Sequence, residues 1–290
     1  MRRAVAVALA GLAVGSAAAS DDARWYAQVD NDVPFATDRW YSSGVRLARV
    51  QPHADHAVEL GLVQEIYSPE AKYFAPHVVD RRPAARLLLS AARHDVSARH
   101  FQTLELAAGV RGPAAQGEGT TDLIHRVIPA RFVDWSREGP NRFDGRIVAA
   151  RTHSLAPFRV HYGAVLGNQV TYAHAGFEVR TGRGDAIAFD SPLLRHAPTP
   201  PGIGGPAASG WSLFAGASAR AVARNELLDE GYREGGPAPE RRDGVLRVAA
   251  GFSAANAWGA VVLALAQESR EFAQQRVPHR FGSLTVHVPF

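Results

Sequence analysis

The chain has 290 residues, a formal net charge of +4 and no cysteine. The absence of cysteine excludes a disulfide framework, a thiolate metal site and a cysteine nucleophile. The net charge is small and the basic residues are dispersed, which argues against a nucleic-acid partner. After the N-terminus, no window offers the roughly 18 uninterrupted apolar residues that a membrane-spanning helix needs, whereas a transmembrane barrel needs only alternating strands of about ten residues.

The first twenty residues differ in composition from the rest of the chain. Two arginines precede a short apolar run, and a string of small residues follows it. This order is typical of a secretory signal peptide, because the apolar core is too short to span a bilayer. A buried N-terminal helix is the less favoured alternative. We therefore expect a signal peptide at residues 1–20 and a single exported domain at residues 21–290.

Read for a period of two, this domain yields about a dozen candidate strands, two of which alternate cleanly between apolar and polar residues. In residues 283–290, for example, Leu284, Val286 and Val288 alternate with polar neighbours. One face of such a strand can meet lipid while the other meets a polar lumen, and only a closed barrel then satisfies every backbone group. We therefore predict an all-β fold, a twelve-stranded antiparallel transmembrane β-barrel. The candidate strands cover residues 24–32, 42–51, 57–67, 85–94, 99–110, 142–152, 157–167, 170–181, 211–224, 242–254, 257–271 and 281–290.

Loop length gives an expectation about which end of the barrel each link occupies. An even number of strands places both termini at the periplasmic end, and long loops belong to the outer end in this architecture. We therefore expect the short links 167–170 and 255–257 at the periplasmic end. The long links expected at the outer end are 68–84, 111–141, 182–210 and 225–241.

Residues 29–44 form the most informative group of polar side chains. They hold three carboxylates, one asparagine, one threonine, one tyrosine and two serines, and an alternating apolar segment, residues 45–50, follows at once. Taken alone, this group can also be a solvated turn or strand end, because Asn and Asp favour such places.

Six further pieces of the chain follow this group in order. They are Ile66-Tyr67-Ser68-Pro69, residues 80–84, residues 104–118 followed by His125, residues 167–176, residues 220–229, and residues 269–272 with 281–284. Together with residues 29–44, they resemble the outer-membrane lipid A 3-O-deacylases of the LpxR type. In that family, an Asn-Asp pair and an Asp-Arg…Tyr-Thr-(small)-Gly turn lie on the first hairpin of a β-barrel.

The resemblance implies a calcium-dependent carboxylic ester hydrolase that removes an acyl chain from lipid A. His125 matches the family's catalytic histidine, and a neutral imidazole near pH 7 can take a proton from an attacking water. Asp32 is implied as a ligand of Ca²⁺, and Asn31 and Ser42 as nearby polar groups that bind the ion or polarise the substrate. A cation beside the ester would stabilise the developing oxyanion. Without the resemblance, His125 would be one of twelve histidines and would be interpreted as structural.

The same resemblance implies where the protein works and with what. It places the protein in the Gram-negative outer membrane, with its site at the outer mouth of the barrel. The implied partners are lipid A in lipopolysaccharide as substrate and the membrane itself, and the implied state is a monomer.

The chain departs from the family pattern near the catalytic histidine. Thr121 stands where the family carries a glutamine, and residues 130–138 replace a Gly-Trp-x-x-Gln-Leu segment. These changes favour one alternative, a catalytically impaired barrel with a structural or lipid-binding role. A passive pore is the other alternative. A narrow twelve-stranded lumen argues against free conduction, because it can be filled by the side chains of Glu178, Arg180, Arg220 and Arg224.

Overall fold

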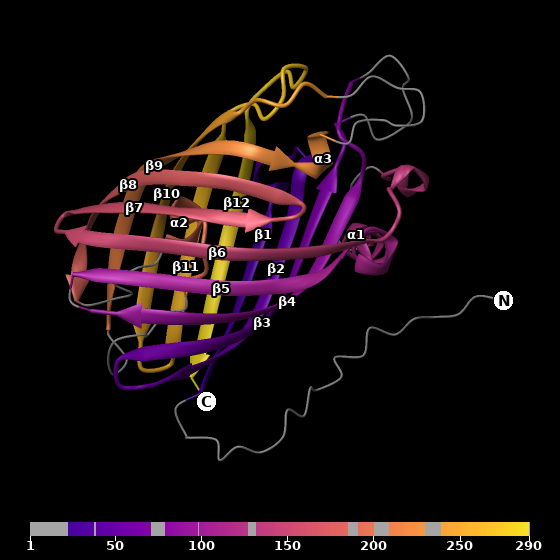
Figure 1. The fold of residues 1–290 in the computed structure, drawn as a ribbon. Helices are drawn as coiled ribbons and strands as arrows, with labels where there is room; N and C mark the ends of the chain where they lie inside the picture. Colours follow the sequence, from indigo (N-terminus) through magenta and orange to yellow (C-terminus); the bar gives the residue numbers. More distant parts are fainter. Residues whose placement is uncertain are drawn as a thin grey trace.

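The computed structural model describes residues 23–37, 39–70, 79–97, 99–126, 132–184, 191–199, 209–229 and 239–289. Within these ranges it has twelve strands: β1 (Arg24–Asn31), β2 (Trp40–Pro52), β3 (His56–Ser68), β4 (Ala84–Val96), β5 (His100–Arg111), β6 (Arg142–Leu155), β7 (Phe158–Gly167), β8 (Val170–Gly184), β9 (Gly210–Asn225), β10 (Gly244–Asn256), β11 (Gly259–Glu268) and β12 (His279–Pro289). All are antiparallel to their neighbours and close into one barrel (Figure 1), so the predicted fold is confirmed. The expected signal peptide, residues 1–20, lies outside the described residues.

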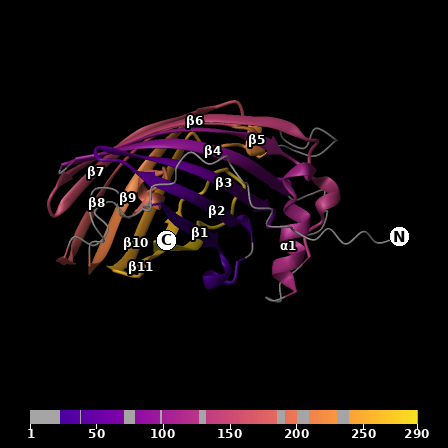
Figure 2. The same cartoon turned by 90° about the horizontal axis from the view of Figure 1, so that it is seen from below.

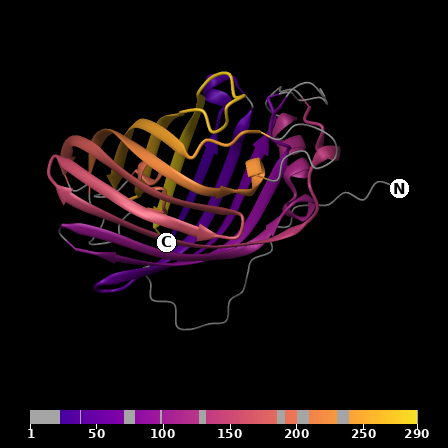
Figure 3. The same ribbon diagram turned by 45° about the horizontal axis from the view of Figure 1, so that its top comes forward.

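The barrel closes where its first strand meets its last. β1 pairs with β12 over its whole length, from Arg24 opposite Pro289 to Asn31 opposite Gly282. The same strand pairs with β2 on its other side. Because every strand has two partners, no edge is left to pair with another chain. Figure 3 shows the strands arranged as a closed ring.

The two faces of the sheet differ in chemistry, as β5 shows. Leu104 and Leu106 point outward and are 50% and 57% exposed, whereas Thr103 and Glu105 between them point into the lumen and are each 1% exposed. This arrangement inverts that of a soluble protein, with large apolar side chains outside and charged ones inside. It is the pattern expected of a barrel whose outer surface meets lipid.

Strand order assigns each link to one of two ends. We call the end that carries Arg24 and Pro289 the terminal end, and the opposite end the loop end. Links 53–55, 97–99, 156–157, 185–209 and 257–258 lie at the terminal end, and links 32–39, 69–83, 112–141, 168–169, 226–243 and 269–278 lie at the loop end.

Two expectations about the links were therefore wrong. The long link 182–210 lies with the termini, and the short link 167–170 lies at the loop end. Loop length is only a statistical guide, whereas alternation of antiparallel strands fixes the end of every link. The short link 255–257 lies at the terminal end, as expected.

Short helices lie in the links. At the loop end are η1 (Val33–Phe35), η2 (Pro113–Ala115), α1 (Gly117–His125), η3 (Trp135–Arg137) and α3 (Glu226–Asp229), while α2 (Pro192–Arg195) belongs to the link between β8 and β9. Seen from below, α1 lies beyond the ends of the strands (Figure 2). No helix among the described residues is long and apolar enough to cross a membrane.

Charged side chains occupy the lumen, as the sequence predicts for three of four residues. Glu178 is fully buried and accepts a 3.0 Å hydrogen bond from Arg159. Arg180 donates a 2.6 Å hydrogen bond to Ser212 Oγ, and Arg220 forms an ion pair with Glu268. Arg224 differs, because its side chain is 51% exposed and pairs with Glu226 beside α3.

Candidate functional site

The link between β1 and β2 brings three of the sequence-predicted residues together. Asn31 ends β1, and its Oδ1 accepts a 2.7 Å hydrogen bond from the backbone N–H of Val33, which begins a tight turn. The backbone N–H of Asp32 donates to the carbonyl of Ser42, at 3.4 Å, across the hairpin. The Ser42 hydroxyl lies 3.0 Å from that of Ser68. Asn31, Asp32 and Ser42 are therefore held on one rigid hairpin at the loop end.

The backbone around this hairpin departs from regular geometry. Trp40 has a φ of 60° and is almost fully buried, although bulky side chains rarely adopt the left-handed region. A register shift between Tyr41 and Ser43 leaves Ser42 without a partner residue on β3. Bulges of this kind re-aim side chains and are common beside active sites, where strained backbone also concentrates.

A hydroxyl and a backbone N–H contact the carboxylate of Asp32. Its Oδ2 lies 2.8 Å from the Thr37 hydroxyl and accepts a 2.7 Å hydrogen bond from the backbone N–H of Arg39. Only 1% of the residue is exposed. Carboxylate, hydroxyl, amide and carbonyl oxygens are the ligands that Ca²⁺ takes, so the donor set fits calcium in its chemistry. Within the described ranges, no three His, Cys, Asp or Glu side chains cluster as a metal site. An ion at Asp32 would therefore use neutral oxygens for its other ligands.

His125 belongs to a separate element at the same end of the barrel. It is the last residue of α1 and is partly buried, and its buried Nδ1 has no hydrogen-bond partner among the described residues. The structure thus does not join His125 to Asn31, Asp32 or Ser42 by a hydrogen bond. Histidine bases are usually oriented by a hydrogen bond through their second ring nitrogen, so this Nδ1 is the atom at which an orienting group would bind.

The position of α1 depends on a close contact at its first residue. A Cβ atom added to Gly117 would lie 2.5 Å from Ala85 Cβ and 2.5 Å from Trp135 Cη2. Glycine therefore lets α1 approach β4 and η3 more closely than any other residue could. Thr121, which replaces the family's glutamine, is buried on this helix one turn before His125.

The altered segment after α1 packs against the barrel through Val133 and Trp135, whereas Phe132 is exposed. Trp135 packs with Ala85, and Glu138 accepts a 3.0 Å hydrogen bond from the Ala85 backbone N–H. Burial and, to a lesser extent, the nearby carboxylate of Glu118 raise the pKa of Glu138 to about 7, against the opposing effects of the Ala85 hydrogen bond and of Arg111. Glu138 therefore titrates near neutral pH beside the helix that carries His125.

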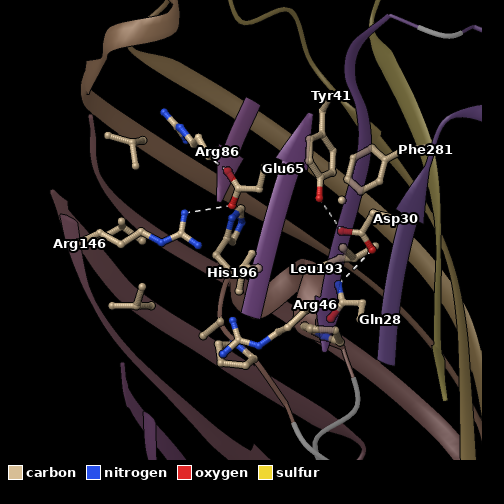
Figure 4. A pocket seen from close by; sticks show the side chains of 18 of the residues that line it. Gln28, Asp30, Tyr41, Arg46, Glu65, Arg86, Arg146, Leu193, His196 and Phe281 are labelled. Carbon is tan, nitrogen blue, oxygen red and sulfur yellow. Dashed lines mark hydrogen bonds and ion pairs between the residues drawn. The ribbon is translucent and has the colours of Figure 1, made fainter. Parts of the chain in front are cut away.

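A separate cavity of about 230 Å³ lies in the lumen (Figure 4). Asp30 lies on its wall, where it accepts hydrogen bonds from Tyr41 Oη at 2.9 Å and Gln28 Nε2 at 3.0 Å. Glu65 lies between Arg86 and Arg146, at 3.3 Å and 3.0 Å. None of the four sequence-predicted residues lines this cavity.

Sequence reasoning missed the partners inside the lumen. Glu65, Arg86 and Arg146 come from β3, β4 and β6, and Asp144 joins them through Arg86 at 3.2 Å. Their only signal in the sequence is a charged residue at an inward position of a strand. Which strands lie opposite each other across the lumen is not encoded in that local pattern.

The closed sheet, apolar outer face and charged lumen define a transmembrane β-barrel with a rigid polar site at one end. The family model described as "Outer membrane protein LpxR" matches residues 4–290, so the chain belongs to the LpxR family of outer-membrane proteins. This confirms the family that the motifs indicated.

Solved structures agree on the fold. LpxR from Salmonella typhimurium is similar with a TM-score of 0.77 and 21% sequence identity, over 92% of this chain and all of that one. BamA from Haemophilus ducreyi, lacking POTRA domains 1–3, covers 92% of this chain and 70% of its own, with a TM-score of 0.40 and 8% identity, which is too distant to support an argument. No curated protein matches the chain.

Proposed function

We propose that this protein is a calcium-dependent lipid A 3-O-deacylase, which hydrolyses an ester-linked acyl chain in the outer membrane. Membership of the LpxR family supports the substrate class. The observation that carries the proposal is the first hairpin, in which Asn31, Asp32 and Ser42 are fixed by hydrogen bonds beside strained backbone. Polar groups held this rigidly at the loop end suit a reaction at the membrane surface.

In the proposed reaction, the four residues have separate roles. His125 accepts the proton of a water molecule as that water attacks the ester carbonyl, and it returns the proton to the leaving alkoxide as the ester C–O bond breaks. Asn31 and Ser42 hold the reacting ester through their amide and hydroxyl groups. Asp32, with neighbouring hydroxyl and carbonyl oxygens, would hold Ca²⁺. When bound, calcium would supply positive charge that stabilises the developing oxyanion.

The experiment is mass spectrometry of lipid A incubated with the refolded protein, with calcium or with a chelator. We expect the loss of one ester-linked acyl chain only when calcium is present. Folding is checked separately by the heat-dependent shift of the barrel on an electrophoresis gel. An unchanged lipid A spectrum from a folded barrel contradicts the proposed activity.

Calcium binding has its own test, which does not depend on turnover. Titration with terbium, a luminescent substitute for calcium, should show saturable binding that the Asp32→Asn variant loses. Asp55→Asn is the matched control, because Asp55 lies in an exposed turn at the terminal end. Equal terbium binding by both variants would remove Asp32 from the metal site.

A second candidate function is a catalytically impaired barrel that binds lipid A without hydrolysing it. The buried Thr121 and the unpartnered Nδ1 of His125 favour it, because a base without an orienting group is a poor catalyst. The Thr121→Gln variant separates the two candidates. Activity gained only in that variant favours the impaired barrel, whereas activity in the unaltered chain excludes it.

A further inference from the structure

The link between β8 and β9 contains a segment that folds back into the lumen from the terminal end. We call residues 191–199 the plug. It contacts the walls formed by β6, β7, β8, β9 and β10. Leu194 and Arg195 are 0% and 1% exposed, and Leu193 and Leu194 pack with Phe214 and Phe281 in the largest apolar cluster. Side chains of the plug also line the lumen cavity, so the plug forms part of the cavity's wall.

Hydrogen bonds from two arginines to neutral oxygen atoms hold much of the plug in place. Arg195 donates to the hydroxyls of Thr152 on β6, at 2.9 Å, and Thr103 on β5, at 3.1 Å, and its guanidinium lies 4.2 Å from the ring centroid of Phe101. Arg247 on β10 donates to the Leu193 carbonyl at 2.8 Å. Hydrogen bonds made by arginine side chains thus connect the plug to β5, β6 and β10.

His196 ends the helix of the plug and meets the wall directly. Its Nε2 lies 2.9 Å from Ser218 Oγ, and its ring centroid lies 4.8 Å from that of His174 and 5.8 Å from that of Tyr172. The remaining part of the His196 ring faces the lumen cavity. A charge on this ring would therefore act on side chains of β8 and β9.

Positive charge surrounds His196. The charged and titratable groups near it are His161 on β7, His174, Tyr172 and Glu178 on β8, Arg220 on β9, Arg247 on β10, Glu268 on β11 and Arg195 on the plug. Arg220 and Arg247 share the carboxylate of Glu268. Arg220 also lies 3.8 Å from Glu271, which pairs with Arg81, and Glu178 pairs with Arg159 and with Ser191. The surroundings of His196 thus hold more arginine than carboxylate.

We infer that residues 191–199 are an acid-released plug, which closes the lumen while His196 is neutral and leaves its seat when His196 becomes protonated. This inference goes beyond the proposed deacylase function and does not depend on it. Protonation adds a cation beside Arg220 and Arg247 and removes the acceptor character that the ring can offer Ser218. The released segment would open the lumen between the two ends of the barrel.

The expected pH dependence follows from the electrostatics. Burial, together with Arg247 and Arg220, lowers the pKa of His196 well below its usual value while the plug is seated. A released His196 would regain the ordinary pKa of about 6.5. The seated state is therefore fully favoured above about pH 6.5, and below it each pH unit shifts the equilibrium about tenfold toward release.

Hydrogen exchange of the intact barrel, followed by mass spectrometry, measures the seating of the plug. After correction for the intrinsic pH dependence of exchange, peptides covering residues 191–199 should exchange about tenfold faster per pH unit between roughly pH 6.5 and 4.5. Peptides from β12 should not change. Unchanged exchange of residues 191–199 across this range overturns the inference.

A variant and a second readout assign the effect to His196. The His196→Gln variant should lose the pH dependence, whereas His53→Gln, in an exposed turn at the terminal end, should keep it. Planar-bilayer conductance should appear at acid pH in the wild type and in His53→Gln only. Equally steep acid release in His196→Gln would show that His196 is not the trigger, and acid exchange without conductance would show that the plug does not close the lumen.

Discussion

Two regions of the barrel, the lumen network around Arg46 and the loop-end segment that carries His125, satisfy their polar groups in different ways. In the terminal half of the lumen, Arg46 donates to Tyr26 Oη at 2.7 Å and to Glu105 at 2.6 Å, and it also pairs with Glu59. His94 uses both ring nitrogens, toward Thr103 at 3.0 Å and Glu59 at 3.1 Å. At the loop end, His125 keeps a buried nitrogen without a partner. A paired network serves stability, whereas strained backbone, such as that of Trp40 at the loop end, concentrates at functional sites.

The largest expected effect on the rate of acyl release comes from comparing one histidine of each region, His125 and His94. His125→Ala should lower the rate of acyl release by about 10²–10⁴-fold, because a general base contributes about that much. His94→Ala should keep the rate of the folded protein and lower its stability instead. Acyl release is measured by mass spectrometry on barrels of confirmed fold. A reversed outcome, with His94→Ala inactive and His125→Ala active, would break the comparison.

Removal of Arg46 tests whether the terminal-half network is structural. The Arg46→Met variant leaves Glu59 and Glu105 buried without their cation, and breaking such a pair costs about 3–5 kcal/mol. Urea unfolding of the barrel in lipid vesicles measures this loss, and the folded fraction should still release acyl chains. Unchanged stability with lost activity would place this network in the reaction instead.

Two glycines on α1 test whether the position of this helix matters for catalysis at the loop end. In Gly117→Ala, the new Cβ would meet Ala85 and Trp135 at 2.5 Å, so α1 must shift and carry His125 with it. We expect acyl release to fall about 10–100-fold, because small misplacements of catalytic groups are costly. In Gly119→Ala, the nearest atom is Gln116 Oε1 at 3.8 Å, so the rate should be unchanged. Equal rates of acyl release in both variants would show that the position of α1 does not affect catalysis.

The smallest expected effect concerns the pH dependence of the loop end. Burial raises the pKa of Glu138 to about 7, so the folded protein holds this proton at a pH where the unfolded chain, with a pKa near 4.5, has lost it. Glu138 therefore lowers stability progressively as the pH rises from about 4.5 to 7. The Glu138→Gln variant should match the wild type near pH 4 and be the more stable of the two at pH 8. Urea unfolding at both pH values checks this. A difference in stability between the two proteins at pH 4 but not at pH 8 would contradict the raised pKa of Glu138.

The strands could be predicted from the sequence because their signal is local. In a barrel, lipid and lumen contact alternate residues, so residues such as Leu284, Val286 and Val288 reveal their strand by spacing alone. The end of the barrel at which each link lies was less predictable. A long link can fold into the lumen instead of extending outside, and its length does not distinguish the two. The plug illustrates this, because its apolar residues and prolines also suit an external loop.

The candidate site was predictable in part for a similar reason. Asn31, Asp32 and Ser42 are neighbours in the sequence, and one hairpin brings them together. The placement of α1 depends instead on the contact of Gly117 with Ala85 and Trp135, which joins three separate elements. The lumen network around Glu65 depends on strand register across the barrel, which no local pattern contains.

The most direct test of the account is a mass spectrum of lipid A from the outer membranes of cells that express the chain. Cells that express the His125→Ala variant at an equal level in the outer membrane provide the comparison. The account predicts lipid A that lacks one ester-linked acyl chain in the first cells and unmodified lipid A in the second. Unmodified lipid A in both, with the two barrels folded, would contradict the proposed deacylase.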